Sequence, residues 1–579
     1  MQNIGIGLYP AEIAEYLANM KTRATFRTTL MVALIAFSLI PIVSQAADKA
    51  KDAANYIPSF KMDIKEQHPM PSTSGLSILS GNIPVAAGKQ GQGDHPLCAS
   101  ATDPHCANSV DINANLIIPP CYSATDRVCI EGLEIGTEGK PLESAVLDHE
   151  FMGTKTPGDN KLGLPAGGSG SIWTAPSLAH QGNELSYAVV ISAYYRLDKK
   201  IAASSQQFDP GYFKADVIPV NMKKGSYCAY EIYEVAKDEY YGEVNISSRP
   251  VGKCNGDTLY ECIMTETGFC AAPAEFLPNT RVALTLRMDS KLTGWLFGRM
   301  KDVDIAITSL DSKTNKLRVE ATSVNLLTGT GSVAKKDLAN YPDLYTFKKK
   351  TWWSGDGKFE DSYALGGSSF GTVSGFEEFA AWEKLIKPDP RDNWRWNFAS
   401  SSGDKGTNCF EKAGKDKLIG LVTTNAPIYW GGAPIFQDGS LNYKVAGLHL
   451  KADGTLFKGS YDLAIRSDVA RCLYGFSNAP IMANVSVLST EGEGQLVATE
   501  LVTEKGGWIT LSAKNFTFSS PTIKVKLSQT GSTPKATSKG AKTSSAAPIT
   551  KKTIACVKGK TTKKVTGMNP TCPKGYTKI

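Results

Sequence analysis

LSYAVVISAYY, residues 185–195, places its larger apolar side chains at every second position. Since neighbouring side chains of a β-strand point to opposite faces, this period of two predicts a strand with one buried face. Runs of the same kind are short and frequent along the chain. Parallel βαβ units would need a helix between each pair of strands, so the pattern favours antiparallel β-sandwiches. We therefore expect a mainly β fold.

Two long segments carry these strand-like runs. The first, 176–340, predicts one β-sandwich-like domain, and the second, 417–530, predicts another. Turn signals such as Asp438-Gly439 separate runs within the second segment. The runs are 185–195, 227–233, 282–286, 303–307 and 317–319 in the first segment, and 418–422, 443–450, 461–465, 481–488, 508–511 and 523–527 in the second.

The remaining segments differ in composition. Residues 1–46 comprise an N-terminal extension and a signal peptide, discussed below. Residues 47–175 are rich in Pro, Gly, Asp and Asn, which predicts a loop-rich region stapled by disulfides. Residues 341–416 are an aromatic-rich insertion. Residues 531–552 are a Lys, Ser and Thr linker that we expect to be disordered, and 553–579 are a small Cys-Cys hairpin module.

The insertion contains one short helix, expected near 374–387. Ser374 and Glu377 make a capping box at its start. Apolar residues then follow at helical spacing, and Pro388 comes directly after the expected end.

Residues 20–46, MKTRATFRTTLMVALIAFSLIPIVSQA, have the pattern of a secretion signal. Basic residues precede an uncharged apolar run, 30–43, and small residues follow it, so we expect cleavage before Ala47. A retained membrane anchor is the alternative, but the run is short for a spanning helix, which needs about 20 residues, and Pro41 interrupts it. We expect an exported protein, secreted or on the cell surface, translated from Met20 or from the upstream methionine.

Twelve cysteines, an even number, fit a chain that folds in an oxidising compartment. Three pairs enclose seven residues each, which predicts local disulfides. The other six pair most simply in sequence order, although exchange among the four cysteines of 228–270 stays open. The expected pairs are Cys98–Cys106, Cys121–Cys129, Cys262–Cys270, Cys228–Cys254, Cys409–Cys472 and Cys556–Cys572. A metal site of Cys98, Cys106, His95 and His105 is the alternative for the first pair.

The positive charge of the chain is confined to its C-terminal tail. The formal charge of the whole chain is +7, and residues 531–579 hold eleven lysines with no Asp, Glu or Arg, which leaves −4 for residues 1–530. Flexible lysines favour loose contact with many anionic groups over shaped recognition, for which arginine would be expected. We expect the tail to tether the protein to anionic envelope polymers or lipid headgroups, and we expect no nucleic acid partner.

Three segments resemble parts of large exported bacterial proteins of unassigned function. They are RVALTLRMDSKLTGWLFGRMKDVDIAI (281–307), YDLAIRSDVARCLYGFSNAPIMANVSV (461–487) and TIACVKGKTTKKVTGMNPTCPKGY (553–576). The last is similar to a small Lys-rich Cys-Cys module at the ends of otherwise dissimilar secreted proteins. The resemblance implies export and a surface location, and it implies no catalytic residue.

Four tryptophans of the insertion could form a platform for sugar rings, because aromatic faces stack on the apolar faces of sugars. They are Trp352, Trp353, Trp394 and Trp396, with Asp356, Asp361 and Asn393 nearby to bond hydroxyl groups. The alternative is that these side chains fill the core or cover a domain junction. A glycan-binding platform requires them to be exposed together.

Residues 367–371, GSSFG, match the G-x-S-x-G pattern of a serine hydrolase, with His449 downstream. The residues before Ser369 are turn-forming rather than a strand, so the context does not fit that pattern. Asp302 and Asp304 suggest calcium, but no EF-hand loop is present, and we interpret them as solvated turn acids. Phosphate-binding and zinc-protease motifs are absent from the sequence, and we predict no cofactor and no metal.

These observations predict a secreted or cell-surface structural or interaction protein without catalytic activity. Glycan binding through the four tryptophans is one alternative, and a secreted serine hydrolase that uses Ser369 and His449 is another. The residues that line a large cavity would distinguish these three classes.

Overall fold

The computed structural model describes the chain from residue 59 with gaps. The described residues are 59–64, 66, 76–84, 94–224, 229–237, 244–251, 263–264, 269–344, 373–401, 408–414, 417–477, 481–488, 494–497, 499–518, 522–529, 552–558, 561–567, 572 and 576–578. The chain forms two compact units, 1–530 and 531–579, called here the body and the tail unit. Within these residues, helices are too short and too polar to span a bilayer.

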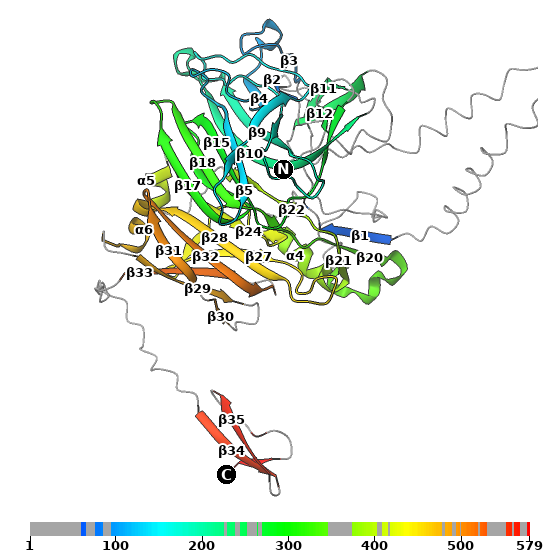
Figure 1. The fold of residues 1–579 in the computed structure, drawn as a ribbon, viewed down its shortest axis with the longest axis vertical. Coiled ribbons are helices and arrows are strands. Elements are labelled where there is room, and N and C mark those ends of the chain that lie inside the picture. Colours follow the sequence, from blue (N-terminus) through cyan, green and yellow to red (C-terminus); the bar gives the residue numbers. More distant parts are fainter. Residues whose placement is uncertain are drawn as a thin grey trace, which may run out of the picture. The chain divides into compact units, whose positions relative to one another are not determined.

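Fifteen strands form the main sheet of the body (Figure 1). Its path runs through β3 (Leu97–Cys98), β2 (Ile78–Asn82), β4 (Asp111–Ile117), β9 (Ser186–Asp198), β10 (Phe208–Lys224), β23 (Asn397–Ser401), β16 (Gly294–Arg299), β24 (Leu418–Thr424), β28 (Lys458–Arg466), β32 (Trp508–Thr517) and β31 (Thr499–Lys505). β8 (Ser171–Thr174) joins β9 to β7 (Val146–Glu150), and β14 (Phe269–Pro273) joins β10 to β13 (Ile263–Met264). Among the described strands of this sheet, only β16 and β24 pair in parallel.

Two further sheets complete the body's layers. The five-stranded sheet has the order β17 (Lys301–Ser309), β18 (Thr314–Thr322), β15 (Thr280–Asp289), β5 (Cys129–Thr137) and β6 (Glu143–Ser144). The six-stranded sheet has the order β25 (Ile428–Tyr429), β27 (Ser440–Ala446), β33 (Thr522–Gln529), β29 (Ile481–Leu488) and β30 (Gly494–Val497), with β26 (Ile435–Gln437) also paired to β27.

Smaller elements lie around these layers. Three small sheets pair β1 (Ser59–Ile64), β20 (Gly329–Ala334) and β21 (Ile386–Pro388); β11 (Ala229–Lys237) and β12 (Val244–Val251); and β19 (Val324–Asn325) and β22 (Trp394–Arg395). The described helices are α4 (Val373–Trp382), α5 (Asn408–Gly414) and α6 (Ser467–Tyr474), with 3-10 turns η1 (Pro104–Cys106), η2 (Ala203–Ser205), η4 (Lys335–Asn340) and η6 (Glu383–Leu385).

Both faces of the main sheet are buried at its centre. Every residue of β24 is buried, and its neighbours Leu421 and Val422 belong to two different cores. The core on one face includes Leu284 of the five-stranded sheet. The core on the other face includes Val525 of the six-stranded sheet. This double burial explains why β24 begins with the continuous apolar run LIGLV, whereas a strand with one solvated face would alternate.

The prediction of a mainly β fold with antiparallel sheets and few short helices is confirmed. Strands from the two predicted sandwich segments, 176–340 and 417–530, lie in the same main sheet, where β16 pairs with β24. Segment 341–416 supplies β23, which lies between β10 and β16. Segment 47–175 supplies β4 and β5 as well as loops. The segments are therefore joined by shared sheets.

The predicted helix near 374–387 exists, and it is shorter than its apolar pattern indicates. α4 begins at Val373 and ends at Trp382, where Phe379 and Trp382 are buried in the core. After the single turn of η6, the chain becomes the strand β21. Ile386 pairs with Gly331 of β20, so sheet hydrogen bonding replaces the helix over the residues before Pro388.

The tail unit contains the predicted small hairpin. β34 (Lys552–Lys558) pairs with β35 (Thr561–Gly567) and also with β36 (Thr577–Lys578). Cys572 is disulfide-bonded. Such a cross-link is what allows a unit this small to hold an ordered sheet.

Candidate functional site

Three of the six expected disulfides are present among the described residues. They are Cys98–Cys106, Cys121–Cys129 and Cys409–Cys472, and the last joins α5 to α6. Cys270 and Cys572 are also disulfide-bonded, while Cys228, Cys254 and Cys262 lie outside the residues that the structure describes. The bonded cysteines fit an oxidising environment.

The alternative metal site at the first cysteine pair is wrong, because Cys98 and Cys106 are bonded to each other. His95 is buried, and its Nδ1 lies 3.2 Å from the carbonyl oxygen of Gly81. His105 is exposed beside Asp103. Elsewhere in the described ranges, no group of three or more His, Cys, Asp or Glu side chains is arranged to hold a metal ion.

The predicted tryptophan platform cannot include Trp396. This side chain is 1% exposed, belongs to the core between the main and five-stranded sheets, and donates from Nε1 to the carbonyl oxygen of Ala321 at 3.1 Å. Trp394 packs against the same core and is partly buried. Trp352 and Trp353 lie outside the described residues. Trp394 of β22 and Trp396, between β22 and β23, both contact this core, as the core-filling alternative predicts.

Ser369 also lies outside the described residues, so the proposed hydrolase pair has only one described member. His449 is exposed at the end of a short connection after β27, and its Nδ1 lies 2.9 Å from the carbonyl oxygen of Phe518. Burial raises the pKa of Glu383, and the charge of the nearby His449 acts in the opposite direction.

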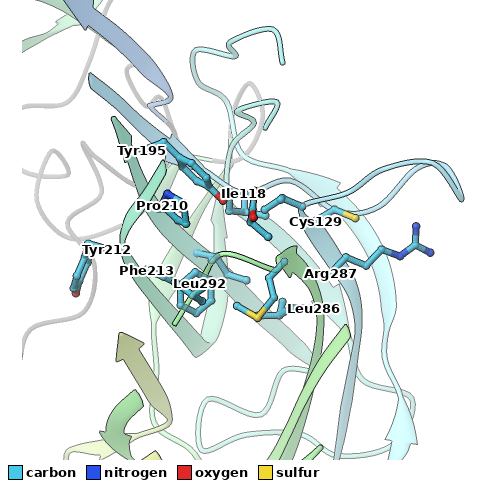
Figure 2. Close-up of a pocket in the computed structure, with 14 residues that line it drawn as sticks. Ile118, Cys129, Tyr195, Pro210, Tyr212, Phe213, Leu286, Arg287 and Leu292 are labelled. Carbon is cyan, nitrogen blue, oxygen red and sulfur yellow. The ribbon is translucent and has the colours of Figure 1, made fainter. Parts of the chain in front are cut away.

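A small void lies between the main and five-stranded sheets (Figure 2). Its volume is about 10 Å³, which is the size of one water molecule at most. Ile118, Phe213 and Leu286 line it with other apolar residues. Arg287 points away from it and donates to the carbonyl oxygens of Ser123, Ala124 and Asp126 in the Cys121–Cys129 loop. This space is a packing defect of the core and offers no site.

A much larger cavity, of about 1300 Å³, lies where turns of the five-stranded sheet approach the ends of main-sheet strands and α6. Its apolar lining includes Leu292, Leu418 and Trp508, all of the core between the two sheets. Neither Trp394 and Trp396 nor His449 lines it. Six cationic side chains do: Arg127, Lys291 and Lys313 from the five-stranded sheet and its turns, and Lys417, Arg466 and Arg471 from the main sheet and α6.

Four of these six cations have carboxylate partners. Arg471 donates two hydrogen bonds to Glu504, at 2.7 and 2.9 Å, and these bonds lower the pKa of Glu504. The other pairs are Arg466–Asp468, Arg127–Asp289 at 4.0 Å and Lys291–Asp209 at 2.6 Å. Lys313 and Lys417 are exposed, and among the described residues neither ammonium group has a carboxylate partner.

A second polar pocket, of about 220 Å³, lies beside the edge of the main sheet. Two carboxylates, Asp302 and Asp462, line it together with Ser512 and Lys514. Asp302 has a left-handed backbone (φ 56°) at a β-bulge of β17. Its N–H donates to Asp462 Oδ1 at 3.0 Å, and its own Oδ1 lies 2.8 Å from Lys514 Nζ. The side chain of Asp302 is 23% exposed, so its interpretation as a solvated turn acid is wrong.

The two carboxylates of this pocket are incompletely partnered. Asp462 is 3% exposed and accepts a hydrogen bond from the Ser512 hydroxyl. The Oδ2 atoms of both Asp302 and Asp462 are buried without a hydrogen-bond partner. Burial, followed by the charge of Asp302, raises the pKa of Asp462 to about 7, against the effects of Ser512, the Asp302 N–H and Lys514.

A buried cluster of oppositely charged side chains lies on the other face of the main sheet. Arg299 is fully buried at the end of β16 and donates from Nε to Glu66 at 2.6 Å. Its remaining donors reach the carbonyl oxygens of Ala426 and Pro427, and its guanidinium lies 4.0 Å from the ring centroid of Tyr429. Each of the three guanidinium nitrogens of this buried cation therefore has an acceptor, and an aromatic ring covers one of its faces.

Glu66 is held from several directions. Asn397 Nδ2 donates to its second carboxylate oxygen at 2.8 Å, and Arg395 donates to its backbone carbonyl at 2.7 Å. Burial alone would raise the pKa of Glu66. The charges of Arg299 and Lys214 and the hydrogen bonds from Asn397 and Arg299 outweigh burial and lower this pKa to about 2. The cluster attaches residue 66, beyond the end of β1, to the main sheet.

Sequence reasoning missed the cavity and both clusters. Comparison of the chain with protein-family models and with curated proteins finds no match. One signal in the sequence did point to the cavity's lining: Lys417 and Arg466 directly flank the predicted strands 418–422 and 461–465, where side chains leave the core. The cavity offers charge and apolar surface, and its described lining contains Arg, Lys, Asp and Glu but no His or Cys.

Proposed function

We propose that this chain is an exported interaction protein without catalytic activity, tethered by its tail unit to anionic groups of the cell envelope. The observation that carries the proposal is the charge of residues 531–579, which hold eleven lysines and no Asp, Glu or Arg. These residues form a compact unit apart from the body. The resemblance of three segments to exported bacterial proteins and the disulfides of the body support the same location.

The tail unit's sheet gathers lysines at neighbouring backbone positions. Cys556 of β34 pairs with Lys563 of β35 on one side and with Lys578 of β36 on the other. β34 also begins at Lys552 and ends at Lys558. A small cross-linked sheet with this composition keeps a high local positive potential, and each lysine near an anionic surface contributes about 1 kcal/mol at most.

The test is retention of the purified full-length protein on isolated envelopes. One variant replaces all eleven tail lysines by glutamine, and its matched control replaces them by arginine, which keeps the charge. We expect the natural protein and the arginine control to be retained at low salt and released at high salt, because salt screens charges between exposed groups. The glutamine variant should not be retained at either salt concentration.

The same experiment separates the possible sources of negative charge. Vesicles of anionic and of neutral lipid report lipid headgroups, and isolated wall polymer reports the polymer. Equal retention of the natural and glutamine proteins, or retention that does not change with salt, would remove the electrostatic tether.

A further inference from the structure

We propose that the 1300 Å³ cavity of the body is a binding site for an anionic polysaccharide, separate from the tail unit. The residues that carry this inference are the six cations of its lining, which come from two different sheets. The inference does not depend on the tail, because all of the cavity's residues lie in the body.

Charge distinguishes this cavity from the rest of the body. Residues 1–530 have a formal charge of −4. The cavity lining, by contrast, has six cations and only four carboxylates, Asp289, Asp311, Asp468 and Glu504. The lining thus has two more cations than carboxylates, and a hollow surrounded by protein strengthens the field of this excess positive charge. The lining is therefore complementary to negative charge.

Two ammonium groups are available for a ligand. Arg466 and Arg471 are held by carboxylates next to them. Lys313 and Lys417 are exposed and, within the described chain, have no carboxylate partner. Lys313 lies in the turn between β17 and β18, and Lys417 directly precedes β24. Lys313 therefore lines the cavity from the five-stranded sheet, and Lys417 lines it from the main sheet.

The size and mixed polarity of the cavity indicate the kind of anion. A volume of about 1300 Å³ exceeds the range of about 300–1000 Å³ that is common for small ligands. Leu292, Leu418 and Trp508 add apolar surface, which suits the faces of sugar rings. Lysine makes point-charge contacts without a fixed geometry, which fits the repeated carboxylates of a flexible acidic polysaccharide.

The test compares two charge-matched variants of the full-length oxidised protein, both made in the variant whose eleven tail lysines are glutamine, so that the tail does not bind the anionic probe. Lys313→Glu with Lys417→Glu changes the cavity, and Lys140→Glu with Lys444→Glu makes the same change of net charge at exposed positions that do not line the cavity. The probe is polygalacturonate, and neutral dextran is its control. We expect the cavity variant to bind polygalacturonate roughly tenfold more weakly than the parent glutamine-tail protein, and the control variant to change by roughly twofold or less.

A second measurement locates the binding independently of the tail. The natural protein is acetylated at its amines in the presence of each probe and analysed by mass spectrometry. Polygalacturonate should protect Lys313 and Lys417 and leave Lys140 and Lys444 reactive. Dextran should protect none of these four lysines. Equal affinity of the two variants, absence of protection at the cavity lysines, or equal protection by dextran would each overturn the proposal. Tail lysines report separately in the same spectra, so a failure of the envelope tether is distinguishable from a failure of the cavity site.

Discussion

The Glu66–Arg299 cluster and the Asp302–Asp462 pair lie on opposite faces of one sheet, and they handle buried charge in opposite ways. Glu66 has a buried cation and an amide directed at its carboxylate, and its pKa falls to about 2. Asp462 has a second carboxylate near it and an unpartnered Oδ2, and its pKa rises to about 7. Burial opposes ionisation in both places. The partners of each carboxylate decide which form the folded protein prefers.

The two sites also have opposite effects on the stability of the body. Arg299 and Glu66 are separated by 233 residues in sequence, so their ion pair holds a distant segment against the sheet. Asp302 and Asp462 bring two acids together at a bulge, and Lys514 compensates only one of them directly. The first cluster stabilises the body at neutral pH, and the second destabilises it there.

The largest expected effect comes from breaking the first cluster at its cation. Arg299→Met leaves Glu66 without its buried partner, and removal of one member of a buried ion pair costs about 3–5 kcal/mol. Urea unfolding at pH 7 measures this loss. The double variant Arg299→Met with Glu66→Gln is the control, because it removes both charges and should recover much of the stability. A double variant as unstable as Arg299→Met alone would contradict the assignment.

The same cluster predicts a pH dependence of defined sign. Because the folded-state pKa of Glu66 is about 2, below its ordinary value of 4.5, its stabilising contribution is fully present above about pH 4.5 and is lost as pH falls toward 2. The difference in unfolding free energy between the natural protein and Arg299→Met should therefore shrink across this window. A difference that stays constant from pH 6 to pH 2.5 would show that the charge of Glu66 is not involved.

At the Asp302–Asp462 pair we expect a smaller change in unfolding free energy, and one that stabilises the protein. Asp462→Asn removes a buried charge while keeping the shape of the side chain, and it should stabilise the protein at pH 8 by about 1–3 kcal/mol. The folded-state pKa of about 7 lies above the ordinary value of 3.8, so the natural protein loses stability as pH rises from about 4 to about 7. Unfolding at pH 4.5 and pH 8 checks this: the advantage of the Asn variant should be larger at pH 8.

The smallest effect should come from Lys514→Met. Its ammonium group pairs with Asp302 at a partly exposed position, and such pairs contribute about 0.2–1 kcal/mol. We expect a loss in that range at pH 8, measured by urea unfolding. Lys505→Met, which removes the exposed pair with Asp304, is the matched control and should have a smaller effect.

Strand positions could be predicted because each depends on its own residues. The runs at 418–422 and 461–465 became β24 and β28, since side-chain alternation or a continuous apolar run is a local property. Their arrangement in one sheet could not be predicted, because it depends on pairings such as β16 with β24, more than 100 residues apart in sequence. The same limit applied to Arg299, whose partner Glu66 is 233 residues away in the sequence.

The tryptophan hypothesis shows a second limit. Trp394 and Trp396 alternate correctly for a strand, and sequence spacing alone does not say which face of that strand meets another sheet. Trp396 turned out to lie on the covered face. The charged cavity could not be predicted for a related reason: its cations come from the five-stranded sheet, the main sheet and α6, and they approach each other only after the two sheets have packed together.

The order of strands in the main sheet has a consequence for the time course of folding. β23 is added between β10 and β16, and β28 and β32, at 458–466 and 508–517, complete the sheet beyond β24. No early part of the chain can therefore complete this sheet alone, and strand edges that are paired in the finished sheet stay exposed until synthesis reaches residue 517. A sheet built from strands so distant in sequence folds slowly, and before it is complete its unpaired strand edges can pair with other chains and aggregate. A chain that ends before β28 should accumulate as aggregate even though most of its strands are present.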